Sequence, residues 1–288
     1  MPQISLFLRT MSLFIASLNS GSNGNCYYIG NGKEAVLVDA GISCRETEKR
    51  MKKLGLKMDS VKAVFISHEH GDHIKGIESI ASKHNLPVYI TPLTLHHSRL
   101  RVSEPMIKHF RAYEAVEIGG LSVLAFPKLH DASDPHSFLV SGNGITIGVF
   151  TDIGAPCQHV IDNFKQCHAA FLEANYDEDM LANGRYPEHL KKRIKSEYGH
   201  LSNRQAAELF ITHGPAFMTH LFLSHLSKDN NNPELATRVF ARHAGKTNIV
   251  VASRYEESAL YHIKGKSYQE PVKKAVAAPK AVQISLFG

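Results

Sequence analysis

One hexapeptide, His68-Glu69-His70-Gly71-Asp72-His73, constrains this chain more than any other stretch. It follows an apolar segment, residues 61–67, that has the pattern of a buried strand. Both His68 and His70 can face one metal ion, while Asp72 and His73 can turn toward a second. Imidazole and carboxylate ligands suit zinc or manganese. The pattern HxHxDH should arise by chance at roughly 1 in 10⁵ positions, so we interpret it as a metal site and not as a solvated loop.

One hexapeptide does not complete a metal site, so further ligands must come from elsewhere in the chain. Polar residues at the ends of apolar strands are the candidates, because a strand holds such a side chain rigidly. Three residues fit this description, namely His130, Asp152 and His225. Each alone is compatible with an ordinary polar strand end. Together with the hexapeptide they indicate one shared site.

The pattern of apolar residues predicts an α/β protein. Strands are expected at residues 13–18, 26–29, 35–39, 61–67, 87–90, 115–118, 121–127, 136–140, 145–150, 169–172, 217–223 and 248–252. Helices are expected at residues 45–54, 74–84, 188–197, 203–213 and 233–243. Strands followed by helices, twice over, favour two packed sheets with helices outside. We expect an N-terminal extension at residues 1–11, one domain at 12–264 and a flexible tail at 265–288.

The order of the candidate ligands resembles the metallo-β-lactamase superfamily, over about residues 12–252. The resemblance implies an αββα sandwich with its site at one edge. It also implies two divalent ions, with zinc expected first and manganese as the alternative. In that pattern one ion is held by His68, His70 and His130, the second by Asp72, His73 and His225, and Asp152 bridges the two.

The charge of such a site favours an anionic substrate. Two divalent ions bring four positive charges, and the two aspartates remove only two of them. Two metal ions ~3.5–4 Å apart lower the pKa of bound water and stabilise an in-line displacement.

Two further residues narrow the reaction class. Glu173 in FLEANYD and His200 in GHLSNRQAA resemble the acid–histidine pair of the phosphodiesterase branch typified by tRNase Z. The resemblance implies that they protonate the leaving oxygen, so Asp72, Glu173 and His200 are the expected catalytic residues. The alternatives are an exposed strand-end acid for Glu173 and, for His200, a residue at a helix entry that Ser202 caps.

Two absences indicate a compact member of this branch. Only 73 residues separate Asp152 from His225, too few for the β-CASP insertion of ribonuclease J, and residues 177–189 are too few for the tRNase Z arm. What remains resembles the YycJ/WalJ branch, through the segments SGSNGN, VDAG, TDIG and LSHLSKDNN. That resemblance implies 5′→3′ exonuclease action on DNA. An RNA-processing nuclease and a thioester or lactone hydrolase of the same fold stay open.

Four polar residues are candidates for substrate contact. Ser22 and Asn23 lie in SGSNGN, whose backbone amides could face phosphate oxygens, although a plain β-turn fits equally. Ser224 and Ser227 flank His225 and could touch phosphate or orient that ligand.

The bulk composition is compatible with a nucleic-acid substrate. The net charge of +6 and the pI near 9.0 suit a polyanion, although many basic proteins bind no nucleic acid. The four cysteines show no CxxC spacing, and no run approaches the ~20 apolar residues of a membrane helix. We therefore expect a cytoplasmic protein.

The pentapeptide QISLF occurs twice, at residues 3–7 and 283–287. It resembles the bacterial sliding-clamp-binding peptide Gln-Leu-Ser/Asp-Leu-Phe. The resemblance implies that Gln283 hydrogen-bonds a pocket rim on the clamp while Ile284, Leu286 and Phe287 fill the pocket. An added β-strand is the alternative. For the N-terminal copy, Met11 is a competing start of the protein.

Overall fold

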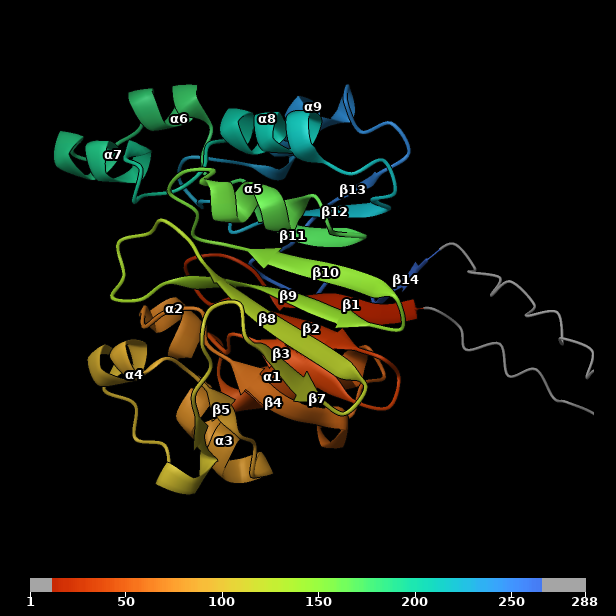
Figure 1. Cartoon of the computed structure of the whole chain (residues 1–288). Helices are drawn as coiled ribbons and strands as arrows, with labels where there is room; N and C mark the ends of the chain where they lie inside the picture. The colour runs from red at the N-terminus through yellow and green to blue at the C-terminus, as the bar shows by residue number, and fades with distance from the viewer. Residues whose placement is uncertain (1–11, 266–288) are drawn as a thin grey trace, which may run out of the picture.

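Two mixed β-sheets packed face to face form the centre of the molecule, and helices cover both outer faces (Figure 1). The computed structural model describes residues 12–265. This architecture confirms the predicted αββα sandwich. Among the described residues, no helix is both long and apolar enough to cross a membrane. Both copies of QISLF lie outside the described residues.

Within residues 12–265 each sheet has seven strands, and the chain completes most of the first before it enters the second. The first sheet has the order β14 (Tyr261–Lys264), β1 (Ser12–Asn19), β2 (Cys26–Gly30), β3 (Ala35–Val38), β4 (Val61–Phe65), β5 (Val88–Tyr89) and β6 (Ile107–Lys108). The second has the order β13 (Asn248–Val251), β12 (His220–Ser224), β11 (Ala169–Glu173), β10 (Ile145–Phe150), β9 (His136–Gly142), β8 (Leu121–Pro127) and β7 (Ala115–Ile118). The short strand β14 was not predicted from the sequence. It pairs antiparallel with β1, from the other end of the domain.

The helices divide between the two sheets. On the side of the first sheet lie α1 (Cys44–Lys53), α2 (Gly71–Ile74), α3 (Ile77–His84) and α4 (Pro92–Ser98) (Figure 1). On the side of the second lie α5 (Gln158–Phe164), α6 (Glu178–Asn183), α7 (Glu188–Lys195), α8 (Asn203–His213) and α9 (Pro233–Ala241) (Figure 1). Ser202 caps α8 through a capping box with Gln205, as the sequence predicts. The helices α4, α5 and α6 were missed because they span only six or seven residues, too few for a clear apolar period.

The helix predicted over residues 74–84 is confirmed over residues 77–84, as α3, but its predicted first turn is wrong. The chain forms two helices, α2 and α3, and Lys75 and Gly76 separate them. The backbone N–H of Gly76 donates to the Ala40 carbonyl, at 2.7 Å. A Cβ at Gly76 would lie 2.0 Å from the Ile42 carbonyl oxygen. The break is therefore made by a tertiary contact, which helical periodicity does not report.

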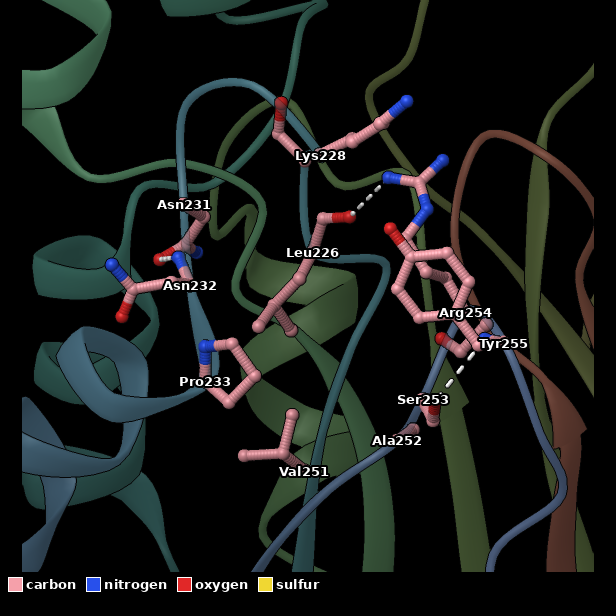
Figure 2. Close-up of a pocket in the computed structure, with 12 residues that line it drawn as sticks. Leu226, Lys228, Asn231, Asn232, Pro233, Val251, Ala252, Ser253, Arg254 and Tyr255 are labelled. Carbon is pink, nitrogen blue, oxygen red and sulfur yellow. Dashed lines mark hydrogen bonds between the residues drawn. The ribbon is translucent and has the colours of Figure 1, made fainter.

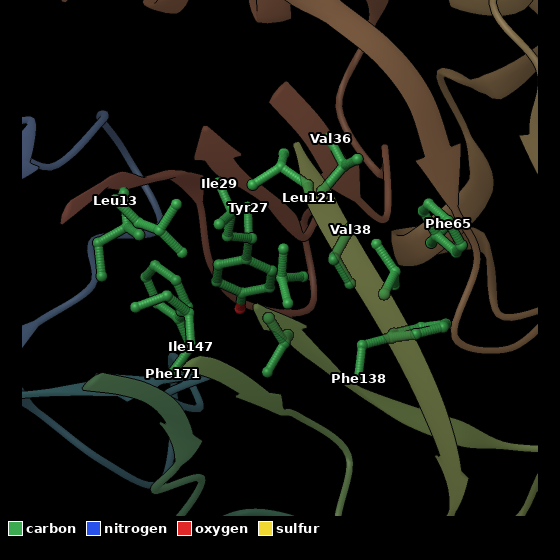
Figure 3. Close-up of a cluster of buried hydrophobic side chains, with 14 of the residues drawn as sticks. Leu13, Tyr27, Ile29, Val36, Val38, Phe65, Leu121, Phe138, Ile147 and Phe171 are labelled. Atoms are coloured by element: carbon green, nitrogen blue, oxygen red, sulfur yellow. The ribbon is translucent and has the colours of Figure 1, made fainter. Parts of the chain in front are cut away.

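A hydrophobic core fills the space between the sheets (Figure 3). Tyr27 of β2 packs on Phe171 of β11, with ring centroids 4.7 Å apart, and Phe65 of β4 meets Phe138 of β9 edge-on. Two further buried clusters lie under the helices, one on the outer face of each sheet. Burial on both faces explains why the strands read as continuous apolar runs. The cores hold the strand ends rigidly at the edge where the candidate ligands gather.

Candidate metal centre and active site

The candidate ligands come from the ends of strands in both sheets. His68 follows β4 of the first sheet, whereas His130, Asp152 and His225 follow β8, β10 and β12 of the second. They converge at one edge of the sandwich. Their ligand atoms form three groups, each within 4.8 Å internally: His68, His70 and His130; Asp72, His73 and His225; and His68, His73 and Asp152. The structure thus brings together all seven residues that the sequence singled out as metal ligands.

Asp152 lies between the first two groups. Its Oδ2 is 3.0 Å from His73 Nε2, and its Oδ1 is 3.8 Å from His130 Nε2. The same Oδ1 is 3.2 Å from His225 Nδ1. One buried carboxylate therefore faces imidazoles of both groups, which is the position a bridging ligand needs.

Two buried nitrogen atoms provide a test of whether this set suits metal ions. His130 Nε2 and His225 Nε2 are both buried and have no hydrogen-bond partner within the described part of the chain. One belongs to each group of three. The Oδ1 of Asp131 and the Oδ2 of Asp72 lie 3.4 Å from these two nitrogens without forming a hydrogen bond. Because buried polar atoms are normally satisfied, both nitrogens suit a metal ion. Imidazole and carboxylate ligands of this kind fit divalent metal ions.

Hydrogen bonds behind the imidazoles fix their orientation. Asp39 Oδ2 lies 2.7 Å from His73 Nδ1, and Glu173 Oε1 lies 2.8 Å from His225 Nδ1. The Gly199 carbonyl lies 3.1 Å from His130 Nδ1. In each case Nδ1 is engaged, which leaves Nε2 to face the centre of the site.

Two orienting residues were not identified as site residues from the sequence. Asp39 is fully buried and also accepts from the backbone N–H and the hydroxyl of Ser67, both at 2.8 Å. It follows the apolar strand β3, so the strand-end signal that found His130 and Asp152 could have found it. Asn25 donates from Nδ2 to Asp72 Oδ2 at 3.2 Å. It lies in SGSNGN, next to the predicted substrate contacts Ser22 and Asn23.

The carboxylates attract positive charge to one half of the site. Burial disfavours the charged form of His73, but Asp152, Asp39 and Asp72 outweigh burial and raise the pKa of His73 to about 10. Burial also opposes protonation of His225, yet Asp152 and its other acidic neighbours raise the pKa of His225 well above its usual value. This half of the site stabilises positive charge, whether a proton or a metal ion carries it.

The other half of the site keeps its imidazoles neutral. Burial lowers the pKa of His130 to about 4. Burial, together with the neighbouring His73, also lowers the pKa of His68 well below its usual value. Neutral imidazole is the form that binds metal ions. These two rings are therefore ready to act as ligands at neutral pH.

Glu173 and His200 form the pair that the sequence predicted. Glu173 is fully buried at the end of β11, and its Oε1 lies 2.9 Å from His200 Nδ1. Its Oε2 accepts from the backbone N–H groups of Ile153 and Leu201, at 2.7 and 3.2 Å. Burial favours the neutral acid, but His200 and His225 outweigh it and lower the pKa of Glu173 to about 2. The pair is an ionised carboxylate holding an imidazole that keeps 19% of its side chain exposed.

Three site residues have a left-handed backbone although none is glycine. They are Asp39, Asp152 and His225, with φ of 59°, 54° and 56°. Each follows the end of a strand. Such a conformation costs about 1–3 kcal/mol per residue and persists only where the surrounding structure holds it. The sharp turns direct these side chains across the sheet edge into the site.

The four predicted substrate contacts differ in their exposure and in their hydrogen-bond partners. Ser22 Oγ accepts from Arg254 Nη2 at 3.3 Å, and Asn23 Nδ2 donates to the Arg254 carbonyl at 2.7 Å. Both residues are exposed. Ser227 is half-buried beside them, on the segment that follows His225. Ser224 is fully buried and donates to the Phe222 carbonyl, so its hydroxyl is not available to a substrate in this structure.

Fold and site together define a metallo-β-lactamase-type protein. Residues 34–225 match the family described as "Beta-lactamase superfamily domain", and the chain belongs to this superfamily. It is 35% identical over 229 residues to Exodeoxyribonuclease YycJ of Bacillus anthracis, with 78% of this chain and 87% of that protein covered. It is 30% identical over 239 residues to Exodeoxyribonuclease WalJ of Streptococcus pneumoniae, with 81% and 89% covered. The predicted resemblance to the YycJ/WalJ branch is thus confirmed.

A solved structure supports the fold. The metallo-β-lactamase fold protein YhfI of Bacillus subtilis superimposes with a TM-score of 0.66, over 87% of this chain and 99% of that chain. The sequence identity is 15%, so this likeness concerns the fold alone.

Proposed function

We propose that this protein is a metal-dependent phosphodiesterase, a 5′→3′ exonuclease that acts on DNA in replication or repair. The observation that carries the proposal is the Glu173–His200 pair beside the two groups of metal-ligand candidates, with 2.9 Å between Glu173 Oε1 and His200 Nδ1. Two relatives that align over most of their own length bear the name exodeoxyribonuclease, which supports this reaction class.

The proposal includes two divalent ions, zinc first and manganese as the alternative. One group of ligands is His68, His70 and His130, the other is Asp72, His73 and His225, and Asp152 serves both. When bound, the ions supply positive charge that stabilises the charge developing on the phosphate. The unsatisfied Nε2 atoms of His130 and His225 support one ion at each group.

The protein's own residues supply the proton. Glu173 fixes the tautomer of His200 by accepting at Nδ1, so Nε2 is the atom that can hold a proton near the leaving oxygen. A DNA 3′-oxygen leaves poorly as an alkoxide, and a proton from His200 makes it a better leaving group. Glu173 does not itself reach the substrate because it is fully buried.

The exposed surface next to the site would hold the strand. Ser22, Asn23 and Ser227 belong to this proposed surface. Ser224 does not, since its hydroxyl is buried. DNA is favoured over RNA by the names of the relatives. A nucleic-acid substrate of this kind fits a cytoplasmic protein.

The test is a nuclease panel. We expect the protein loaded with Zn²⁺ or Mn²⁺ to release nucleotides from 5′-phosphorylated DNA, faster than from RNA of the same sequence. Asp72→Ala is the inactive control, because it removes one carboxylate of the second group. Absence of nucleotide release from both polymers, together with hydrolysis of a thioester or lactone, would overturn the proposal.

We also propose that the C-terminal QISLF binds the sliding clamp. Gln283 would hydrogen-bond the rim of the pocket, and Ile284, Leu286 and Phe287 would fill it. The tether that the sequence predicts before it would raise the concentration of the enzyme at the clamp. Deletion of residues 283–288 should abolish clamp binding in a surface-based binding assay and leave hydrolysis of free oligonucleotides unchanged. Clamp affinity that survives the deletion would reject this part.

A further inference from the structure

A pocket of about 380 Å³ lies next to the metal-ligand candidates and shares Ser227 with the proposed substrate surface. Its walls come from two segments, the one after β12 and the one after β13, with Ser20 between them. Figure 2 shows Asn231, Asn232 and Pro233 on one side, and Arg254 and Tyr255 on the other, with Leu226 between them. The volume lies within the range of small-molecule sites.

The pocket and the candidate metal centre share part of their framework. Leu226, a lining residue, directly follows the candidate ligand His225. The hydroxyl of Ser20, another lining residue, accepts from the backbone N–H of His225 at 2.7 Å. A ligand in the pocket would therefore lie beside the chain that carries one candidate metal ligand.

Two cations at the pocket suit a phosphate. Lys228 and Arg254 line it, and within the described part of the chain neither forms an ion pair with a carboxylate. The Arg254 guanidinium donates to the Leu226 carbonyl at 3.4 Å and to Ser22 Oγ at 3.3 Å. These neutral partners hold the guanidinium in place and leave its charge uncompensated.

Tyr255 supplies an exposed aromatic ring on an anchored backbone. The residue is 71% exposed. Its carbonyl accepts from Arg50 Nη2 at 2.9 Å, and its N–H donates to Ser253 Oγ at 3.1 Å. An exposed ring on an anchored backbone is a platform on which a base can stack. The apolar side chains of Leu226 and Val251 form the adjacent floor (Figure 2).

We propose that this pocket receives one nucleotide of a single DNA strand whose end lies at the metal centre. The base stacks on Tyr255 over Leu226 and Val251, and the adjoining phosphate lies at Lys228 and Arg254. The inference rests on the proposed nuclease function, because it assumes that the strand reaches the metal centre. A stacking contact of this kind accepts every base, which suits an enzyme that degrades DNA of any sequence.

The first experiment is an abasic scan with the metal-loaded full-length protein. A set of 5′-phosphorylated single strands carries one abasic nucleotide at successive positions from the 5′ end. We expect the wild-type protein to lose roughly tenfold in kcat/KM at one position of the scan. Tyr255→Ala should be slower on the intact strand and show no extra loss at that position, while Tyr255→Phe behaves as wild type. Tyr113→Ala, which removes an exposed ring outside the pocket, is the matched control.

A binding measurement separates this inference from the nuclease proposal. Anisotropy of a labelled, cleavage-resistant phosphorothioate strand reports affinity without turnover. We expect Tyr255→Ala to bind roughly tenfold more weakly, and Lys228→Ala to bind more weakly with a smaller salt dependence. Lys246→Ala, a surface lysine outside the pocket, should match wild type.

The two proposals fail in different ways. If DNA is degraded but neither the abasic penalty nor the affinity depends on Tyr255, the pocket proposal is overturned alone. If affinity depends on Tyr255 and Lys228 but no DNA or RNA is degraded, the nuclease proposal falls and the pocket remains a nucleotide site. If the phosphorothioate strand does not bind the wild-type protein, the pocket proposal is overturned. A pocket that instead binds a protein partner would give this last result.

Discussion

At the centre of the site one buried carboxylate holds two imidazoles. Glu173 Oε1 lies 2.9 Å from Nδ1 of His200 and 2.8 Å from Nδ1 of His225. The proposed proton donor and a proposed metal ligand are therefore positioned by the same oxygen atom. Any movement of Glu173 would disturb both, so single substitutions at Glu173 should not separate the two roles.

Substitution of His200 can test the proton-donor role separately from metal binding. His200→Ala should lower kcat on DNA by about 10²–10⁴-fold, because the leaving alkoxide loses its proton donor. The loss on bis(p-nitrophenyl) phosphate should be much smaller, because nitrophenolate leaves without a proton. Steady-state kinetics on both substrates checks this. Equal losses on the two substrates would contradict a general-acid role, and so would an unchanged rate on DNA.

Asp39 offers a test of the hydrogen bonds that orient the imidazoles of the site. Asp39→Asn should weaken metal affinity by roughly 10–100-fold, because the amide holds His73 Nδ1 less firmly than the carboxylate does. Competition with a chromophoric chelator measures that affinity. Asp59→Asn, an exposed aspartate in the turn before β4, is the control and should bind metal like the wild-type protein. Wild-type affinity in Asp39→Asn would show that Asp39 serves packing only.

At the scale of elements, the site depends on how closely three loops approach one another. The backbone N–H of Asn25 donates to the Asp72 carbonyl at 2.7 Å, and that of Ala40 donates to the His73 carbonyl at 2.8 Å. The N–H of Gly41 donates in turn to the Asn25 carbonyl, at 2.8 Å. The loops after β1, β3 and β4 therefore form one hydrogen-bonded unit, and it sets the position of Asp72 and His73.

Alanine substitutions at two glycines of this unit should have different effects on stability and metal content. A Cβ at Gly41 would lie 1.6 Å from the Asp72 carbonyl oxygen, whereas a Cβ at Gly71 would meet nothing within 4 Å. Gly41→Ala should therefore displace α2, lower the midpoint of thermal unfolding by several degrees and reduce metal content. Gly71→Ala should keep the wild-type values of both. Calorimetry measures the thermal midpoint of both variants, and metal analysis after dialysis measures their metal content. A Gly41→Ala variant with the wild-type values of both would show that the loops can separate freely.

The sequence predicted the elements best where the signal is local. The buried strands and the candidate ligands at their ends were found because apolar runs and the residues that follow them can be read directly. The break at Gly76 and the strand β14 were missed because each depends on a partner distant in the chain. Asp39 carries a local strand-end signal, but its partners Ser67 and His73 lie in another loop, so its orienting role was not predicted. The proposed stacking role of Tyr255 likewise depends on segments that meet only in the fold.

At the scale of the whole molecule, the hydrophobic cores and the metal-ligand candidates are separate sets of residues. The core between the sheets and the two outer clusters consist of apolar residues and include none of the candidate ligands. Removal of the ions should therefore leave the sandwich folded. Removal of the ions would change only one edge of the sandwich, where several buried carboxylates and imidazoles would lose the ions proposed to bind them.

Chelation tests this separation. Treatment with a strong chelator should abolish hydrolysis, preserve the far-ultraviolet circular dichroism spectrum and lower the thermal midpoint. Ions that bind only the native state contribute about 2.7 kcal/mol at 100 times their Kd, and that contribution is lost on removal. Addition of Zn²⁺ or Mn²⁺ should restore both activity and midpoint. Collapse of the spectrum on chelation would instead make the ions structural.

The pairing of β14 with β1 has a consequence for the fate of incomplete chains. Ser12–Ile15 of β1 pair with Tyr261–Lys264, the last strand of the described chain, and from Phe14 onward β1 also pairs with β2 on its other side. A product that stops before Tyr261 would present the apolar strand β1 as an open edge, with unpaired N–H and C=O groups that another copy can bind. Such a product retains every candidate ligand, yet aggregation would remove it before its activity could be measured.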